Sequence, residues 1–160
     1  MKVFKPPHFE NSSEYEGKKV FLGGSIEMGK AKDWQTEIQN TFKKDKVSFF
    51  NPRRDDWDNS WEQTIEDDNF RGQVMWELDH LLSADIVVFF IQGDTKSPIS
   101  LMEIGLLALP HQNKEMKMLI CCEEKFFRRG NIEVMAYKFD IPLVATLDEL
   151  KKELKKLLKD

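Results

Sequence analysis

Short apolar runs alternate with longer segments of helical period along most of this chain. Trp34, Ile38 and Phe42 recur every four residues, a spacing that predicts an amphipathic helix. Residues 85–91 (DIVVFFI) are apolar on both faces, which is typical of a strand in the middle of a parallel sheet. The whole pattern predicts strands at residues 19–22, 47–50, 85–91, 118–122 and 141–144, and helices at 33–43, 70–83, 99–109, 132–139 and 147–159.

Strands that alternate with helices indicate an α/β fold, a three-layer sandwich around a parallel sheet. Five strands fit a flavodoxin-like sheet of order 2-1-3-4-5. Residues 1–17 are polar and contain Pro6-Pro7, so we expect a loose N-terminal arm followed by a single domain over residues 18–160. The helix at 99–109 is apolar on nearly every side, which predicts that it is buried all round.

The segments that follow the predicted strands are rich in Gly, Arg, Ser and acidic residues. In folds of this kind, ligands bind outside the carboxyl ends of the strands. The segments concerned read GGSIEMGK, NPRRDDWDNSW, QGDTKSPIS and EEKFFRRGN. Their composition at these positions predicts a binding site at that edge of the sheet.

Composition narrows the class of protein. The 160 residues are 41% hydrophobic and 32% charged, which fits one compact domain, and the net charge of -4 gives no reason to expect a nucleic-acid partner. No uncharged apolar run reaches the length of a transmembrane helix, and the N-terminal residues contain no apolar stretch of signal-peptide length. Two adjacent cysteines offer neither a disulfide nor a metal-ligand spacing, so we expect a cytoplasmic protein without a metal or cofactor. The three histidines, at 8, 80 and 111, are interpreted as surface residues.

Glu103 is the most informative residue. Apart from His111, it is the only ionisable side chain between Lys96 and Lys114. A carboxylate in such an apolar helix is strongly disfavoured unless it has partners or a chemical role. The alternative is a glutamate near the start of a helix that caps backbone amides.

Glu77 is a second carboxylate on an apolar helix face, beside Val74 and Leu81. It could form an internal ion pair with Arg53 or Arg54. The alternative is a carboxylate pair with Glu103, and paired carboxylates are the usual means of breaking glycosidic bonds.

Three loops supply candidate substrate-binding residues. The first matches a phosphate-binding loop until Ala31, where Ser or Thr should hold magnesium, so its glycines are interpreted as room for a sugar or a base. Arginine forks suit carboxylates or phosphates, and a tryptophan can stack on a base, although a solvated turn would look the same. The serines before Glu103 could instead cap their helix. The candidates are Gly23, Gly24, Ser25, Arg53, Arg54, Asp55, Trp57, Ser97, Pro98 and Ser100.

Four motifs in this order resemble the nucleoside 2-deoxyribosyltransferase family, in its branch with a PISLxELG-like signature. They are FLGGSIEMG, NPRRDDW, QVMWELDHLLSADIVVFF and SPISLMEIG, and the resemblance covers roughly residues 18–145. The family implies a covalent mechanism without metal or cofactor. By that resemblance Glu103 attacks the anomeric carbon and expels the base, and a second base or water then releases the sugar.

The resemblance also assigns other positions. Glu77 lies where the family keeps an Asp near the nucleophile. Ser97 stands where the transferases tend to carry an Asp and where related nucleotide N-hydrolases have a phosphate-contacting Ser. Asn131 resembles an Asn supplied to the site of a neighbouring subunit, which implies a homodimer or a higher homo-oligomer.

Three functions stay open at this point. The first is a deoxyribosyltransferase-like glycosyltransferase of nucleoside salvage, whose partners are a nucleoside or nucleotide and a free base. The second is a nucleoside 5′-monophosphate N-glycosidase, a hydrolase. The third is a non-catalytic module that binds or senses nucleotides. A requirement for a 5′-phosphate separates the second from the first, and absence of turnover identifies the third.

Overall fold

A computed structural model describes residues 1–9, 11–26, 31–54, 58 and 60–159. Its centre is a six-stranded sheet in which every neighbouring pair of strands is parallel, in the order β1-β3-β2-β4-β5-β6. The strands are β1 (Lys2–Phe4), β2 (Lys18–Gly24), β3 (Val47–Phe50), β4 (Ile86–Ile91), β5 (Lys117–Cys122) and β6 (Leu143–Val144). The helices are α1 (Trp34–Thr41), α2 (Asp68–Ser83), α3 (Pro98–Gln112), α4 (Arg129–Phe139) and α5 (Leu147–Leu157), with a short 3-10 turn, η1, at Ser12–Glu14.

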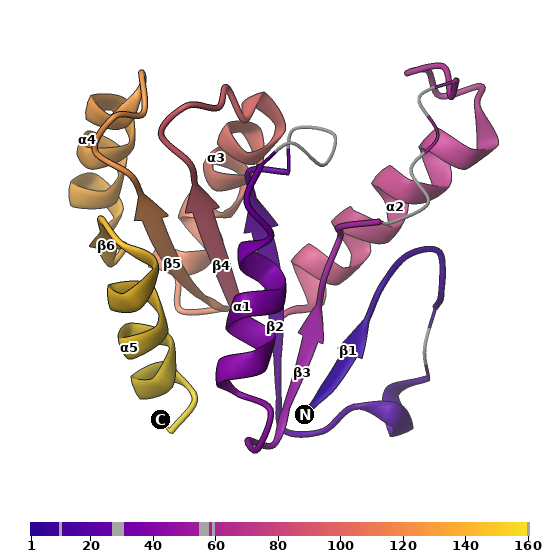
Figure 1. The fold of residues 1–160 in the computed structure, drawn as a ribbon, viewed down its shortest axis with the longest axis horizontal. Coiled ribbons are helices and arrows are strands. Elements are labelled where there is room, and N and C mark those ends of the chain that lie inside the picture. The colour runs from indigo at the N-terminus through magenta and orange to yellow at the C-terminus, as the bar shows by residue number, and fades with distance from the viewer. Residues whose placement is uncertain (10, 27–30, 55–57, 59, 160) are drawn as a thin grey trace.

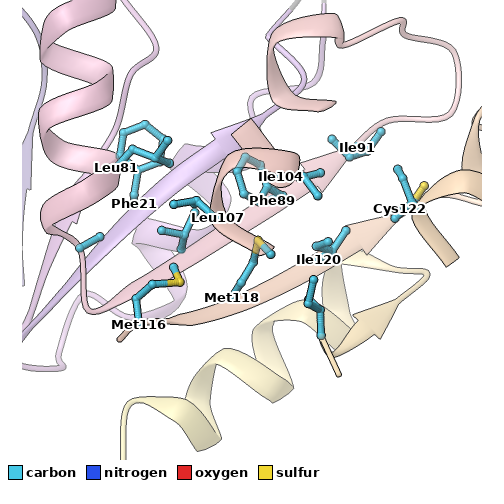
Figure 2. Packing of buried hydrophobic residues seen from close by; sticks show 14 of the residues in the cluster. Phe21, Leu81, Phe89, Ile91, Ile104, Leu107, Met116, Met118, Ile120 and Cys122 are labelled. Atoms are coloured by element: carbon cyan, nitrogen blue, oxygen red, sulfur yellow. The ribbon is translucent and has the colours of Figure 1, made fainter. Parts of the chain in front are cut away.

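Helices cover both faces of the sheet (Figure 1). Because side chains alternate along a strand, β2 sends Val20 and Leu22 towards α1 and α5, and Phe21 towards the opposite face. Figure 2 shows that opposite face, where Ile104 and Leu107 of α3 pack over the sheet. The fold is thus an α/β sandwich of three layers, as predicted.

The predicted strand order is confirmed, but the number of strands is not. Without β1 the order is β3-β2-β4-β5-β6, which is the expected 2-1-3-4-5 arrangement. The sixth strand comes from the segment that was expected to be a loose arm. Lys2–Phe4 pairs with β3, and the buried side chain of Phe4 packs against Tyr15 and Phe50. Three residues are too few to show an alternating pattern, so sequence reasoning missed this strand.

The helix α3 is not buried all round, contrary to the prediction. Ile104 and Leu107 are buried, while four apolar side chains on the other side are exposed, namely Ile99, Met102, Leu106 and Leu109. An apolar pattern alone does not distinguish a core contact from an uncovered surface.

The helix α2 buries a different face from the predicted one. Its buried residues are Gln73, Trp76, His80 and Leu81, whereas Val74 on the predicted apolar face is only partly buried. The interpretation of His80 as a surface residue is therefore wrong. Its ring stacks on the indole of Trp76 at a centroid distance of 3.9 Å, and its Nδ1 contacts the Trp76 carbonyl at 2.7 Å.

Cys121 and Cys122 are buried free thiols in β5. Among the described residues, no helix is both long enough and apolar enough to cross a membrane.

Candidate active site

Glu103 is buried in the sixth position of α3, with only 6% of its surface exposed. None of the described residues donates a hydrogen bond to its carboxyl group or forms an ion pair with it. Burial raises the pKa of Glu103 to about 8, and the nearby charge of Glu77 adds to the effect. The alternative interpretation, in which Glu103 caps backbone amides at the start of its helix, therefore has no support among the described residues.

Glu77 lies on α2, partly buried, and close enough to Glu103 for the two carboxyls to interact electrostatically. Its Oε1 accepts a hydrogen bond of 2.6 Å from Nε2 of Gln73. Burial raises the pKa of Glu77 to about 7, and the hydrogen bond from Gln73 opposes part of that rise. Two carboxyls with raised pKa values near one another are a common feature of sites that manage protons.

Gln73 is a candidate site residue that the sequence analysis did not select. Its Nε2 donates to Glu77 and also to the carbonyl of Pro52, at 3.2 Å. Its Oε1 accepts from Nη1 of Arg54 at 3.4 Å. Only one orientation of the amide satisfies two acceptors and one donor at the same time, so the NH₂ group must face Glu77. The spacing of four residues on one helix was the only signal that could have linked Gln73 to Glu77.

Three buried hydroxyls meet where β2 and β4 end. Ser25 Oγ lies 2.8 Å from Thr95 Oγ1 and 2.6 Å from Ser97 Oγ, and Thr95 and Ser97 are 2.9 Å apart. Ser25 Oγ also accepts from the backbone N–H of Gln92, at 2.9 Å. The structure therefore brings the predicted residues Ser25 and Ser97 together, and adds Thr95, which no sequence pattern marked.

The start of α3 lies beside these hydroxyls. Ser97 stands at the N-cap position, but its hydroxyl makes no capping hydrogen bond, and its backbone is left-handed, with φ 44°. Pro98 is the first helical residue, and Ser100 is buried one turn before Glu103. Helix N-termini attract anions, so this corner suits a negatively charged group.

The glycines that end β2 let two strands approach closely. Gly24 has φ +134°, and a Cβ there would lie 2.2 Å from the carbonyl oxygen of Phe90. A Cβ on Gly23 would meet the ring of Phe89 at 2.7 Å. These contacts lie within the protein, and the assignment of both glycines to substrate binding stays a prediction.

The arginines after β3 have different surroundings. Arg53 donates to the carbonyls of Ala31 and Lys32, at 3.1 and 3.3 Å, and so connects the loops after β2 and β3. Arg54 contacts Gln73, and its guanidinium lies over the ring of Trp61, 4.9 Å from the centroid. The other two candidates of this loop, Asp55 and Trp57, lie outside the described residues.

Asn131 lies on α4, a different helix from those that carry the two carboxyls. It is exposed on α4 and lines a shallow hollow of about 300 Å³, whose described walls are Leu101, Ile104, Arg128, Asn131, Ile132 and Met135. Neither Glu77 nor Glu103 belongs to those walls. Within the part of the chain that the structure describes, no three His, Cys, Asp or Glu side chains gather closely enough to hold a metal ion.

Comparison with known proteins identifies one family. Residues 17–126 match the family described as nucleoside 2-deoxyribosyltransferase like. A conserved protein from Enterococcus faecalis V583 is similar in structure, with a TM-score of 0.58 and 14% identity over 88% of this chain and 98% of its own. The CMP N-glycosidase BcmB from Clostridium botulinum is also similar, with a TM-score of 0.57 and 15% identity over 88% of this chain and 99% of its own. At these identities the two structures show a shared fold. No curated protein matches the chain in sequence.

Proposed function

We propose, since the chain belongs to the nucleoside 2-deoxyribosyltransferase-like family, that it breaks the N-glycosidic bond of a deoxynucleoside and passes the sugar to another base or to water. The observation that carries this proposal is the buried carboxyl of Glu103, with its pKa raised to about 8 and Glu77 beside it. A carboxyl without a described partner is unfavourable for the fold, so a chemical role explains its presence better than a structural one.

Glu103 acts as the nucleophile in this proposal. Its ionised carboxylate attacks the anomeric carbon, and the bond between that carbon and the base nitrogen breaks. The electron pair of that bond leaves with the base, which takes up a proton. A 2-deoxy sugar lacks an electron-withdrawing hydroxyl, so positive charge develops readily on the sugar, and a buried carboxylate stabilises it far better than water would.

In this proposal Glu77 holds and releases the proton that the departing base requires. With a pKa of about 7 it can hold or release a proton near neutral pH, as the departing base requires. The glycosyl ester on Glu103 then reacts with a second base or with water, and the carboxylate is restored. Every step uses side chains and substrate alone, so the proposal includes no metal or cofactor. The substrates suit a role in nucleoside salvage in the cytoplasm.

The hydroxyls of Ser25, Thr95 and Ser97 favour a second candidate, a nucleoside 5′-monophosphate N-glycosidase. Three hydroxyls beside a helix N-terminus are suitable donors to a phosphate group. The structurally similar BcmB is described as a CMP N-glycosidase, which is consistent with this candidate. In either case we propose that the substrate contacts the loops that contain Gly23–Ser25, Arg53–Trp57 and Ser97–Ser100.

We also propose that the protein is a homodimer or a larger homo-oligomer. The helices α3 and α4 contact one another, and α3 exposes four apolar side chains. Phe127, just before α4, and Val134 and Tyr137 on α4 are 60%, 69% and 91% exposed. Phe127, Asn131 and Val134 line a common hollow. Exposed apolar side chains on neighbouring helices are typical of an interface, and a second copy bound at this hollow would contact Asn131.

The test is a survey of substrates. Each deoxynucleoside and each deoxynucleoside 5′-monophosphate is incubated with the protein, with and without a free base, and the products are separated by chromatography. Exchange of bases supports the transferase, and release of free sugar or sugar phosphate supports a glycosidase. Turnover of the 5′-phosphates alone supports the second candidate, and binding without turnover refutes both.

Variants test the nucleophile. Glu103→Gln keeps the shape and removes the charge, and Glu103→Ala removes both, so each should lower the rate at least about a hundredfold. The matched control is Glu124→Gln, at an exposed position, which should leave the rate unchanged. With a slow substrate, mass spectrometry of the intact wild-type protein should show a deoxyribosyl adduct on Glu103. Full activity of Glu103→Ala, or an adduct on another residue, refutes the assignment.

A further inference from the structure

The N-terminal arm is an ordered addition to the family domain. The family match begins at residue 17, and the arm precedes it. Phe4 is buried, its carbonyl accepts a hydrogen bond of 2.9 Å from the N–H of Asn51, and its strand pairs with β3. The arm is therefore attached to the sheet at the strand that leads into the predicted substrate loop after β3.

Beyond β1 the arm contacts α2. The indole N–H of Trp76, a completely buried side chain, donates to the carbonyl of His8 at 2.7 Å. His80, which stacks on Trp76, also faces the ring of Phe9 at 6.1 Å and the ring of Phe50 at 4.6 Å. These contacts join the arm, α2 and β3 around one turn of α2.

Few other side chains of α2 are buried. Figure 1 shows that α2 begins away from the sheet and runs back towards it, while the chain after β1 rises beneath the helix. Of its sixteen residues, four are buried, and Trp76 and His80 are two of them. Glu77 directly follows Trp76, so the position of its carboxyl depends on where the indole is held.

We propose that residues 1–9 brace α2 through Trp76 and thereby position the carboxyl of Glu77 beside Glu103. Trp76 is a positioning residue in this scheme, because it acts through Glu77 and does not itself contact the substrate. The inference rests on the proposed function for its effect on turnover, and the contact between the arm and α2 can be tested without turnover.

Loss of the contacts between the arm and α2 should change the pKa of Glu77. If α2 moves outward, water reaches Glu77, and the pKa that burial now raises to about 7 falls towards its ordinary value of 4.5. The other groups that face Glu77 are the carboxyl of Glu103 from α3 and the amide of Gln73, with Arg54 behind that amide.

The experiment is a ¹³C NMR titration of the glutamate carboxyls in the full chain. The Glu77 signal is identified by its loss in Glu77→Gln. Trp76→Phe keeps an aromatic ring and removes the N–H donor, and deletion of residues 1–9 removes the acceptor. Both should lower the pKa of Glu77 by at least about half a unit. The control is Leu154→Ala, in the buried stripe of α5 on the opposite face, which destabilises the fold without removing a contact between the arm and α2.

Turnover provides the second measurement. In Trp76→Phe we expect kcat to fall at least about tenfold, with a smaller change in KM, because a misplaced catalytic group slows chemistry more than binding. If deletion of residues 1–9 prevents folding, Trp76→Phe alone decides the question. An unchanged pKa of Glu77 in a folded Trp76→Phe protein overturns the inference. Absence of any turnover in the wild type refutes the proposed function and leaves the titration result valid.

Discussion

The buried carboxyl of Glu103 should make the protein less stable as the pH rises, and Glu103→Gln should remove that loss. The pKa of Glu103 is about 8 in the fold, against an ordinary value of 4.5 that applies to the unfolded chain. Between these two pH values the folded protein keeps a proton that the unfolded chain has released. Stability from this group is therefore complete below about pH 4.5 and declines as the pH rises through about 8.

The size of the decline follows from the two pKa values. They differ by 8 − 4.5 = 3.5, and each pKa unit corresponds to about 1.36 kcal/mol. The free energy of unfolding should thus fall by roughly 3 kcal/mol between acid and pH 7, and by roughly 5 kcal/mol by pH 9. Because Glu103 is only 6% exposed, solvent screens little of this effect. The loss is a large part of the roughly 5–15 kcal/mol that stabilises a typical domain.

Urea unfolding at pH 5, 7 and 9 measures this effect in wild type and in Glu103→Gln. The variant should be more stable by less than about 1 kcal/mol at pH 5, and the difference should grow to roughly 5 kcal/mol at pH 9. The exposed substitution Glu124→Gln is the control, and its difference from wild type should not grow with pH in this way. Equal differences for Glu103→Gln at pH 5 and pH 9 would refute the reasoning, because the carboxyl would then ionise without loss of stability.

Three further predictions concern the pH dependence of turnover, the pKa of Glu77 and the oligomeric state. Wild-type kcat/KM should decline as the pH is lowered below about 8, because Glu103 must be ionised to attack. Initial rates between pH 5 and 9 that increase towards acid would contradict this. Gln73→Met removes the hydrogen bond that lowers the pKa of Glu77, so a ¹³C NMR titration should show that pKa raised, and a lowered pKa would contradict the role given to the amide. Leu106→Lys places a charge on the exposed face of α3 and should convert the proposed oligomer to a monomer in sedimentation analysis. The control Thr36→Lys, at an exposed position on α1, should leave the oligomer intact. A wild-type protein that sediments as a monomer would refute the interface.

The central architecture could be predicted because its pattern is regular. The strand β4 is apolar on both faces, and the buried side chains of α1, Trp34 and Ile38, follow a helical period. Each pattern indicates one strand or one helix, and the alternation of strands and helices fits the 2-1-3-4-5 order of a flavodoxin-like sheet. Glu103 was found for the opposite reason, because a lone carboxyl in an apolar helix breaks its pattern.

The remaining features depend on contacts between segments far apart in the sequence. Gln73 contacts Pro52, 21 residues away, and Ser25 meets Thr95 across 70 residues. A polar residue whose partner is so distant leaves no local periodicity to detect. The face that α2 buries is a similar case, because Trp76 is covered by the arm, which sequence reasoning had left unpaired.

The pairing of β1 with β3 has a consequence for how the chain is made. Lys2 lies opposite Ser48, so β1 is synthesised 48 − 2 = 46 residues before the part of β3 with which it pairs. At about 5–20 residues per second, that delay lasts several seconds. Until β1 pairs with it, β3 is an open edge of the sheet, and its Val47–Phe50 backbone can pair with another chain. The three residues of β1 therefore do more than enlarge the sheet, because they also cover an edge that would otherwise favour aggregation. They can do so only after β3 has been synthesised.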